Sequence, residues 1–332
     1  MKGKCGQSIA RDFNVKIPIT QSDEWANLQD EIGEKYFFEK QSDFQYLAIQ
    51  KDTPVGCYLY LPYGPIYTGE VGFQKAYTSL RALADKTKSI FIRLEPQDPE
   101  FKKYGPDNLR KVKDISPMDT WVLDLTPDRE TLVGNFKHSL RATYRNYAKK
   151  GLKVEVTKDP DEIKHLVALQ GKLYDRKHLN AFSREYLEAE LRQPFASLYL
   201  VKYYQPEGSE ETDDASLPAD GQVIAASLFF DYDGTRYYMQ SAADDDYRRL
   251  RATAALLIAA ILDAKEQGIK EFDFWGIAPD GAPADHPWMG FTEFKKSFGG
   301  EARHYAGTYD IVLNKPKYAL YNKLRKLHKR LS

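Results

Sequence analysis

Cysteine, net charge and long apolar runs are what this sequence lacks. Its 332 residues include only two cysteines, Cys5 and Cys57, and its 48 basic side chains are balanced by 48 acidic ones. Two thiols exclude a disulfide-stabilised scaffold, and no spacing of cysteine and histidine suits a zinc site. Because the net charge is zero, binding to a polyanion would depend on a local basic patch and not on the field of the whole molecule.

Segments that direct a chain into or across a membrane are also missing. The longest apolar run, 252–262, is far too short to span a bilayer. The first residues contain no apolar stretch typical of a signal peptide. We therefore expect a cytoplasmic protein.

Familiar catalytic signatures are absent as well. The sequence contains no G-x-S-x-G, no H-E-x-x-H and no P-loop, and none of its six histidines lies in a recognisable triad or metal spacing. These absences exclude the usual hydrolase and metalloenzyme classes.

What the sequence does contain is enough apolar material for two domains. Apolar residues make up 42% and aromatic residues 13% of the chain, which is sufficient for sizeable cores. In each half, the predicted elements pair a run of antiparallel strands with a strand–helix–strand crossover. We therefore predict an α+β fold with mixed, largely antiparallel sheets and a weak internal repeat of acyltransferase type. A second unit begins at Leu152, and one strand is expected over 304–313.

The stretch 271–300 has the most distinctive pattern. It begins as a strand with Phe272 and Phe274, continues as a loop rich in glycine and proline, and ends in F-K-K-S-F-G-G at 294–300. Two interpretations fit this ending. The phenylalanines can hold a lysine at a cleft while the glycines permit a close approach of the backbone. Alternatively, a helix ends at Gly299 with lysines at its negative pole.

Two further segments are strongly basic. Lysine or arginine recurs every fourth residue in 137–150, with tyrosines between and no acidic residue four positions away; the cations are Lys137, Arg141, Arg145 and Lys149. Such a stripe suits a phosphate backbone, although a solvated helix face has the same appearance. The C-terminal helix 318–331 is also basic, which fits either contact with anionic lipid or simple exposure to water.

Acyltransferases of this architecture hold the coenzyme A pyrophosphate on glycine-rich backbone at the start of a helix. The corresponding segment here, 249–254, reads R-L-R-A-T-A and contains no glycine. Coenzyme A binding is therefore disfavoured.

Five motifs run through the chain: Gln21-Ser22-x-x-Trp25, Tyr63-Gly64-Pro65, Arg141-x-x-x-Arg145-x-x-Ala148-x-x-Gly151, Phe272-Asp273-Phe274-Trp275-Gly276-Ile277 and Phe294-Lys295-x-x-Phe298-Gly299-Gly300. In these motifs the chain resembles the FemABX family of peptidoglycan bridge-forming aminoacyltransferases. The last two motifs, close together and in this order, are the most specific. The resemblance implies two tandem acetyltransferase-like (GNAT-like) domains, with the last helical segment returning to the first. The expected division is therefore 1–151 plus 314–332 and 152–313. Some family members carry a coiled-coil arm in the second domain, and this chain resembles the compact members without it.

The resemblance implies a function. Family members move an amino acid from aminoacyl-tRNA to the peptide side-chain amine of a peptidoglycan precursor, either UDP-MurNAc-pentapeptide or lipid II. No metal or redox cofactor is implied. We expect a monomer whose first domain binds the precursor and whose second domain holds the aminoacyl-tRNA end, with peripheral contact at the inner face of the membrane.

The resemblance also implies residue roles at the reacting centre. Lys295 matches the family's Phe-Lys lysine and is the predicted catalytic residue, with Phe294 as a wall of the same site. Lys296 would be solvated or contact tRNA phosphate, together with the 137–149 cations. Asp119 is the predicted carboxylate for the incoming amine, although a turn residue would look the same.

Further residues are candidates for precursor binding. Gln29 occupies the place where family members have a basic residue after the Gln-Ser-x-x-Trp element. Tyr63 and Tyr238 are expected to contact rings. Arg176 or Arg184, with Tyr186, would hold phosphate or a peptide carboxylate, and the sequence does not choose between the two arginines.

Two other functions remain open at this point. The same fold would serve an acyl-CoA-dependent N-acyltransferase. A non-catalytic binder of RNA or a membrane surface would use 137–150 and the C-terminal helix. Neither accounts for the paired motifs at 272–277 and 294–300.

Overall fold

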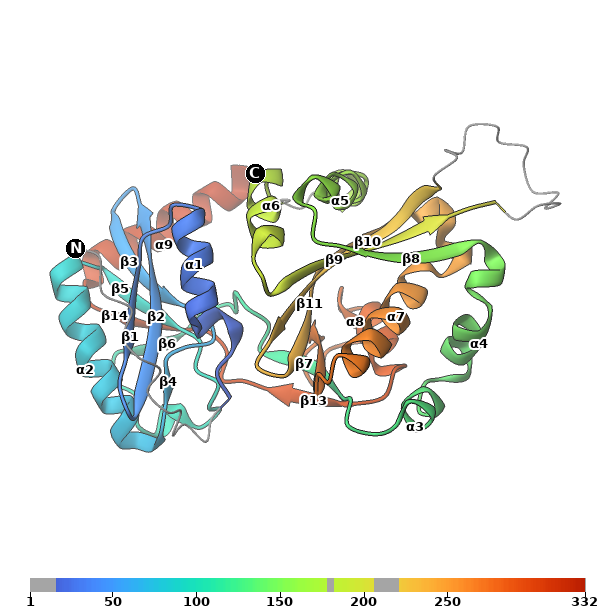
Figure 1. The fold of residues 1–332 in the computed structure, drawn as a ribbon. Helices are drawn as coiled ribbons and strands as arrows, with labels where there is room; N and C mark the ends of the chain where they lie inside the picture. The colour runs from blue at the N-terminus through green and yellow to red at the C-terminus, as the bar shows by residue number, and fades with distance from the viewer. Residues whose placement is uncertain (1–15, 178–181, 206–220, 332) are drawn as a thin grey trace. The chain divides into compact units, whose positions relative to one another are not determined.

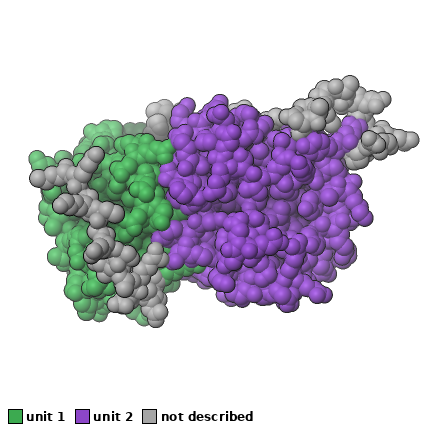
Figure 2. All heavy atoms as spheres, in the orientation of Figure 1, with its two compact units in different colours: residues 1–116, 305–332 green, residues 117–304 purple. Residues whose placement is uncertain are grey.

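Strand pairing between distant parts of the chain divides the protein into two units. The computed structural model describes residues 16–177, 182–205 and 221–331, with only the backbone described for 172–177 and 328–331 (Figure 1). Unit 1 comprises residues 1–116 and 305–332, and unit 2 comprises 117–304 (Figure 2). The acidic segment 206–220 lies outside the described residues.

Unit 1 contains a seven-stranded sheet. Its main path is β1 (Tyr36–Lys40), β2 (Phe44–Thr53), β3 (Gly56–Leu61), β5 (Phe91–Leu94), β14 (Tyr309–Val312) and β6 (Leu109–Lys111), with β4 (Ile66–Tyr67) beside β2. Its helices are α1 (Asp23–Glu31), α2 (Gly69–Thr87) and α9 (Lys315–Leu331). The Ser22 hydroxyl caps α1 by accepting the Trp25 N–H at 3.1 Å.

Unit 2 contains the second seven-stranded sheet. Its order is β13 (Glu301–His304), β7 (Asp119–Asp124), β12 (Glu271–Gly276), β11 (Thr235–Ala243), β10 (Gln222–Tyr232), β9 (Ala196–Tyr203) and β8 (Leu152–Thr157). Its helices are α3 (Arg129–Gly134), α4 (His138–Asn146), α5 (Ile163–Lys177), α6 (Arg184–Arg192), α7 (Ala252–Glu266) and α8 (Met289–Lys296). In Figure 1, α5 and α6 cover one face of this sheet, and α7 with α4 covers the other.

Both sheets follow one plan. Antiparallel strands lead to a single parallel step, β3 to β5 through α2 in unit 1 and β11 to β12 through α7 in unit 2. Antiparallel pairing then resumes on the far side of that step. The predicted α+β class, with two acetyltransferase-like domains and mixed, largely antiparallel sheets, is confirmed.

The predicted boundaries between the domains differ from the observed ones. Residues 117–151 belong to unit 2, because β7 pairs with both β12 and β13 and α4 packs against α7. The predicted strand 304–313 is two strands in different sheets, since β13 pairs with β7 whereas β14 pairs with β5 and β6. The divisions therefore fall after Ser116 and after His304, and not after 151 and 313.

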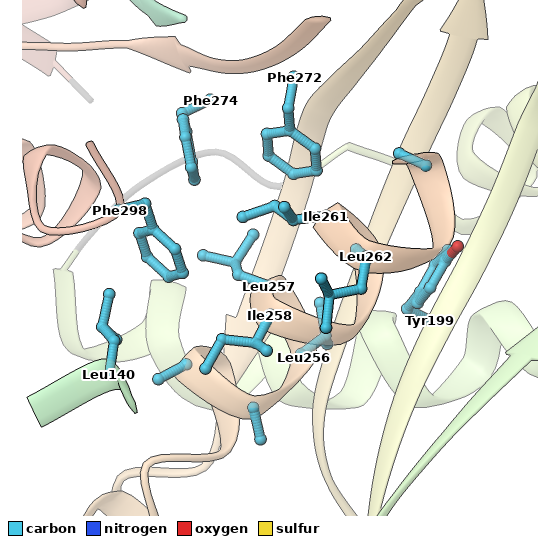
Figure 3. Packing of buried hydrophobic residues seen from close by; sticks show 14 of the residues in the cluster. Leu140, Tyr199, Leu256, Leu257, Ile258, Ile261, Leu262, Phe272, Phe274 and Phe298 are labelled. Carbon is cyan, nitrogen blue, oxygen red and sulfur yellow. The ribbon is translucent and has the colours of Figure 1, made fainter. Parts of the chain in front are cut away.

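Helix α7 is the centre of the unit 2 core. It is apolar on nearly every side, so it is buried by its surroundings. Figure 3 shows Leu257 and Ile261 of α7 near Phe272 and Phe274 of β12 and near Phe298. The Phe298 ring lies 5.2 Å from that of Phe274 and thereby ties the end of α8 to the sheet.

The glycines after α8 allow the chain to return to the sheet. Gly299 and Gly300 have φ angles of +84° and +94°, which side chains rarely adopt. A Cβ on Gly300 would lie 2.3 Å from the Val122 carbonyl oxygen. The predicted helix is present but ends at Lys296, with Ser297 as its C-cap and Gly299 two residues beyond the cap. The same glycines permit close backbone packing on β7.

A buried ion pair fixes the last strand and helix of unit 1. Arg93 donates two hydrogen bonds of 2.7 Å to Asp310, and the Tyr318 hydroxyl of α9 donates to the same carboxylate at 2.8 Å. The side chains of Arg93 and Asp310 are 2% and 0% exposed. Loss of one partner would leave a buried charge without compensation.

We therefore predict that Asp310→Ala lowers the free energy of unfolding by about 3–5 kcal/mol. Urea denaturation would measure the change. Glu100→Ala is the matched control, because its pair with Lys103 is 66% and 68% exposed and should contribute less than about 1 kcal/mol. Equal small effects of the two substitutions would contradict the prediction.

Candidate active site

In unit 2, the parallel strands β11 and β12 pair over a short stretch and then separate. The two strands pair only from Thr235 to Tyr237 and from Glu271 to Asp273. Between Asp273 and Gly276 the register of β12 against β7 shifts, and Trp275 has a φ of +65°. Such an irregularity bends a strand and changes the direction of its backbone groups.

Lys295 reaches this irregular segment from α8. Its Nζ donates a hydrogen bond of 2.6 Å to the Gly276 carbonyl oxygen, and the residue is only 8% exposed. The same Nζ lies 5.0 Å from the ring centroid of Phe291 and 5.9 Å from that of Tyr238. Aromatic faces attract a cation. The lysine is therefore held at a fixed place by one carbonyl and two rings.

Burial shifts the pKa values of Lys295 and of Asp273, the acid whose charge acts on this lysine. Desolvation lowers the pKa of Lys295 to about 8, and the charge of Asp273 opposes this change. Desolvation also raises the pKa of Asp273 to about 6, although the Trp275 N–H bond at 2.7 Å and the charges of Arg303 and Lys295 oppose the rise. Between these two values, both groups are predominantly charged.

A histidine and an aspartate form a second polar group in unit 2. His304 of β13 lies opposite Asp119 of β7, and its Nδ1 is 2.6 Å from the Asp119 Oδ1. The Asp119 backbone carbonyl accepts the Ile277 N–H at 3.0 Å. Asp119 is 3% exposed, whereas the His304 side chain is 48% exposed. The pair thus has a buried acid and an accessible ring.

Exposed aromatic side chains surround the start of α8. Trp288 and Phe291 are 40% and 39% exposed, and their ring centroids are 5.8 Å apart. His286 lies edge-on to Trp288 at 6.0 Å. Because Phe291 also contacts Lys295, this group offers flat apolar surfaces next to the buried cation.

Several predicted site residues come together here. Lys295, Tyr238 and Asp119 all belong to the strands and helix around the Gly276 backbone. Phe294 is half-buried and packs edge-on against Phe298 at 5.4 Å, so it supports α8 from the core side. Lys296 is exposed, pairs with Glu293 at 3.4 Å and lies 5.7 Å from the Trp121 ring.

The residues predicted to bind the precursor in unit 1 are buried. Gln29 is 3% exposed and Tyr63 is 4% exposed. Tyr63 packs edge-on against Tyr305 with 5.1 Å between ring centroids. The ligand contacts of Gln29 and Tyr63 stay a prediction, and in this structure both side chains are buried within unit 1.

The two candidate arginines are now distinguishable in part. Arg184 is exposed and donates to Glu188 one helical turn away at 2.6 Å, which is an ordinary surface pair. Tyr186 stacks on Phe182 with 5.2 Å between ring centroids. The side chain of Arg176 lies outside the described residues.

The basic stripe predicted over 137–149 is not continuous. Lys137 precedes α4, and Lys149 lies in the separate 3₁₀ turn Ala148–Lys150. Arg141 donates to the carbonyl oxygens of Gly134 and Phe136 at 2.9 and 2.5 Å, so it closes the turn between α3 and α4. Arg145 remains on an exposed face of α4. The cations of this segment thus divide between structural and exposed positions.

Sequence reasoning missed His304, Asp273 and Phe291. Asp119 and His304 are 185 residues apart, and no spacing rule joins them. Asp273 had a weak signal, since it is an acid between two buried phenylalanines of one strand. Phe291 lies one helical turn before Lys295, which is the distance at which side chains on one helix meet.

The described residues contain neither a cluster suited to a metal ion nor a helix suited to crossing a membrane. In that part of the chain, no three His, Cys, Asp or Glu side chains converge as a metal site would require. Nor does any described helix have both the length and the apolarity needed to cross a membrane.

The charge coupling at the site gives a testable pKa. Asp273→Asn removes the anion that favours the ammonium, so the pKa of Lys295 should fall below its value of about 8. A pH titration of lysine side-chain ¹⁵N NMR signals would measure this change, with exposed Lys296 as the internal control. An unchanged or higher pKa at Lys295 would show that Asp273 does not act on it.

Comparison with known proteins places the chain among related sequences. The model of the FemAB family matches residues 208–326. The aminoacyltransferase FemA of Staphylococcus epidermidis is 30% identical over 106 residues, which cover 32% of this chain and 25% of that protein. The lipid II:glycine glycyltransferase of Staphylococcus haemolyticus is 28% identical over 115 residues, 34% of this chain and 27% of that protein. The matches thus span about a quarter of these curated relatives.

Solved structures extend the likeness to nearly the whole fold. The crystal structure of FemX has a TM-score of 0.74 at 18% identity and covers 91% of this chain and 94% of its own. The structure of L-PGS from Bacillus licheniformis has a TM-score of 0.56 at 14% identity, covering 85% and 84%. The family match, the sequence relatives and the shared fold agree with the motifs around Lys295, and the chain is similar to the FemAB family over residues 208–326.

Proposed function

We propose that the protein is an aminoacyltransferase that moves an amino acid from aminoacyl-tRNA to the peptide side-chain amine of a peptidoglycan precursor. The acceptor is UDP-MurNAc-pentapeptide or lipid II, and the product is the start of an interpeptide bridge. Similarity to the FemAB family supports this class of reaction. The observation that carries the proposal is the buried Lys295, held on the Gly276 carbonyl within the family's two most specific motifs.

The reaction needs positioning and charge stabilisation more than covalent chemistry. An aminoacyl ester is already activated, so an amine attacks it once the two groups are aligned. Negative charge then develops on the ester carbonyl oxygen and on the departing ribose oxygen. A fixed cation in a water-poor place stabilises that charge, and removal of one such donor typically costs about 10²–10³ in kcat.

Lys295 has the properties that this role requires. Among the described residues, its ammonium donates one hydrogen bond, to the neutral Gly276 carbonyl, so it keeps donors for an incoming oxygen. Its pKa of about 8 keeps the side chain mainly charged at neutral pH. Burial strengthens the electrostatic effect of this charge on a developing oxyanion.

The partners follow from the same proposal. Unit 2 would hold the aminoacyl-tRNA end, because Trp288 and Phe291 offer stacking surfaces beside Lys295. The exposed cations Arg145, Lys149 and Lys296 would contact tRNA phosphates. Unit 1 would bind the precursor. We propose a monomer as the working form.

The decisive experiment combines the protein with a mixed pool of aminoacyl-tRNAs and either UDP-MurNAc-pentapeptide or lipid II. Mass spectrometry of the precursor would identify both the amino acid and the acceptor. Lys295→Met should lower transfer by about 10²-fold or more while the protein remains folded by circular dichroism. Lys270→Met, an exposed lysine of the same unit with no role in the proposal, is the matched control and should retain its activity. Full activity of Lys295→Met would contradict the role assigned to this lysine.

We also propose a cytoplasmic protein that acts peripherally at the inner face of the membrane. Helix α9 supports this location. Leu320, Leu324 and Leu327 are 47%, 37% and 46% exposed and lie on one side of the helix. Tyr318 packs edge-on against Phe91 from the opposite side. Lys317 and Lys323 are exposed next to the leucines, which is the pattern of a helix that lies in an anionic lipid interface.

Replacement of these three leucines by glutamine should release the protein from anionic vesicles. Co-sedimentation with phosphatidylglycerol vesicles would show wild-type binding that high salt weakens, and the triple variant should remain in the supernatant. Ile115→Gln is the control, since Ile115 is 48% exposed elsewhere in unit 1. Equal binding of the triple variant and the wild type would show that α9 does not contact lipid.

A further inference from the structure

We propose that His304 accepts the proton of the acceptor amine during transfer and that Asp119 positions its imidazole. This inference rests on the proposed aminoacyltransferase function. It assigns a proton acceptor to a reaction for which Lys295 supplies only positive charge.

Accessibility separates the roles of the two residues. Asp119 is 3% exposed, and no described residue donates a hydrogen bond to its Oδ2. The His304 side chain is 48% exposed. A substrate can therefore meet the ring and not the carboxylate. The sequence-based assignment of Asp119 to the amine is thereby revised, because Asp119 acts through the histidine.

The carboxylate determines which ring nitrogen is free. Asp119 Oδ1 lies 2.6 Å from His304 Nδ1. In a neutral imidazole, a carboxylate at this distance favours the tautomer with its proton on Nδ1, which leaves the Nε2 lone pair free. Among the described residues, two charged groups face the ring: Asp119 of β7 and Asp280 of the loop after β12. Asp280 is 85% exposed and lies 3.7 Å from Nε2, which is beyond hydrogen-bond distance. An amine can therefore approach Nε2.

One peptide group joins this pair to the lysine. The Gly276 carbonyl accepts the Lys295 ammonium at 2.6 Å, and the adjoining Ile277 N–H donates to the Asp119 carbonyl at 3.0 Å. Because a peptide unit is planar and stiff, both contacts depend on the same rigid group. The proton acceptor and the fixed cation are thus held by a common piece of backbone.

The step balances without a further reactant. The amine nitrogen attacks the ester carbonyl carbon, and His304 Nε2 takes one proton from that nitrogen as the C–N bond forms. The Lys295 ammonium stabilises the resulting oxyanion. The C–O bond to the ribose then breaks, and the imidazolium gives its proton to the departing oxygen. The products are an amide and a free hydroxyl, and both side chains return to their initial protonation states.

A purely structural role is the competing explanation, since His304 and Asp119 are a cross-strand pair. Such pairs stabilise a sheet without taking part in chemistry. A structural pair would affect unfolding but would not change the pH profile of the reaction. The pH profile therefore discriminates between the two explanations.

The test measures kcat/KM against pH for the whole chain with aminoacyl-tRNA and the precursor. His304→Gln should lower kcat/KM at neutral pH by about 10²–10⁴-fold. The pH profile of this variant should lack the acid limb that a general base gives the wild type, because a glutamine amide accepts no proton. Asp119→Asn should lower the rate less, because the imidazole remains but loses the carboxylate that orients it. Glu301→Gln, exposed on the same strand, is the control and should leave the profile unchanged.

A spectroscopic readout complements the kinetics. Imidazole ¹⁵N NMR of the wild type should show the proton on Nδ1 of His304, and Asp119→Asn should abolish this preference. An active His304→Gln enzyme with an unchanged pH profile, or a proton on Nε2, would overturn the inference while leaving the Lys295 proposal intact. A wild-type protein inactive with every donor and acceptor would overturn both.

Discussion

The hydrogen bond from the Lys295 ammonium to the Gly276 carbonyl is the contact around which unit 2 is arranged. A neutral carbonyl compensates a buried cation only in part, so the pKa of the lysine is lowered to about 8. The carbonyl is available because β12 changes register against β7 before Gly276. The same change separates β12 from β11. One irregular strand thus provides both the opening in the sheet and the acceptor for the lysine.

Aromatic packing fixes the position of α8 and therefore of Lys295. Phe298 joins the end of α8 to Phe274 of β12 and to Phe136 before α4, with ring centroids 5.2 and 5.4 Å apart. These rings lie on the apolar surface of α7 (Figure 3). A lysine side chain has many rotamers, and the burial of its helix in this way removes most of them. The site is therefore positioned from the core outward.

The sequence predicted the architecture better than it predicted the contacts. The order of strands and helices was enough for two tandem domains, because each half repeats an antiparallel run and a crossover. The boundaries were wrong, since the pattern of a strand does not say which sheet it joins, and β7 joins the later one. Local spacing located Lys295 on the last turn of a helix.

Contacts over long distances were not predictable in the same way. His304 and Asp119 meet only because β13 returns to β7. Gln29 and Tyr63 had the chemistry of ligand contacts, but burial depends on neighbours that the local sequence does not name. Arg141 appeared to belong to a surface stripe, yet the chain turn before α4 directs its guanidinium to backbone carbonyls. In each case a partner distant in sequence, or the local path of the backbone, decides the role.

The position of β14 has a consequence for synthesis on the ribosome. Unit 2 is complete once residue 304 has emerged, whereas unit 1 still lacks the strand that lies between β5 and β6. Domains fold as cooperative units, so the second unit along the chain can form its core while the first waits. A premature stop in 305–310 would therefore leave unit 2 whole and would remove the Asp310 carboxylate from Arg93, exposing the interior of a sheet that began to form much earlier.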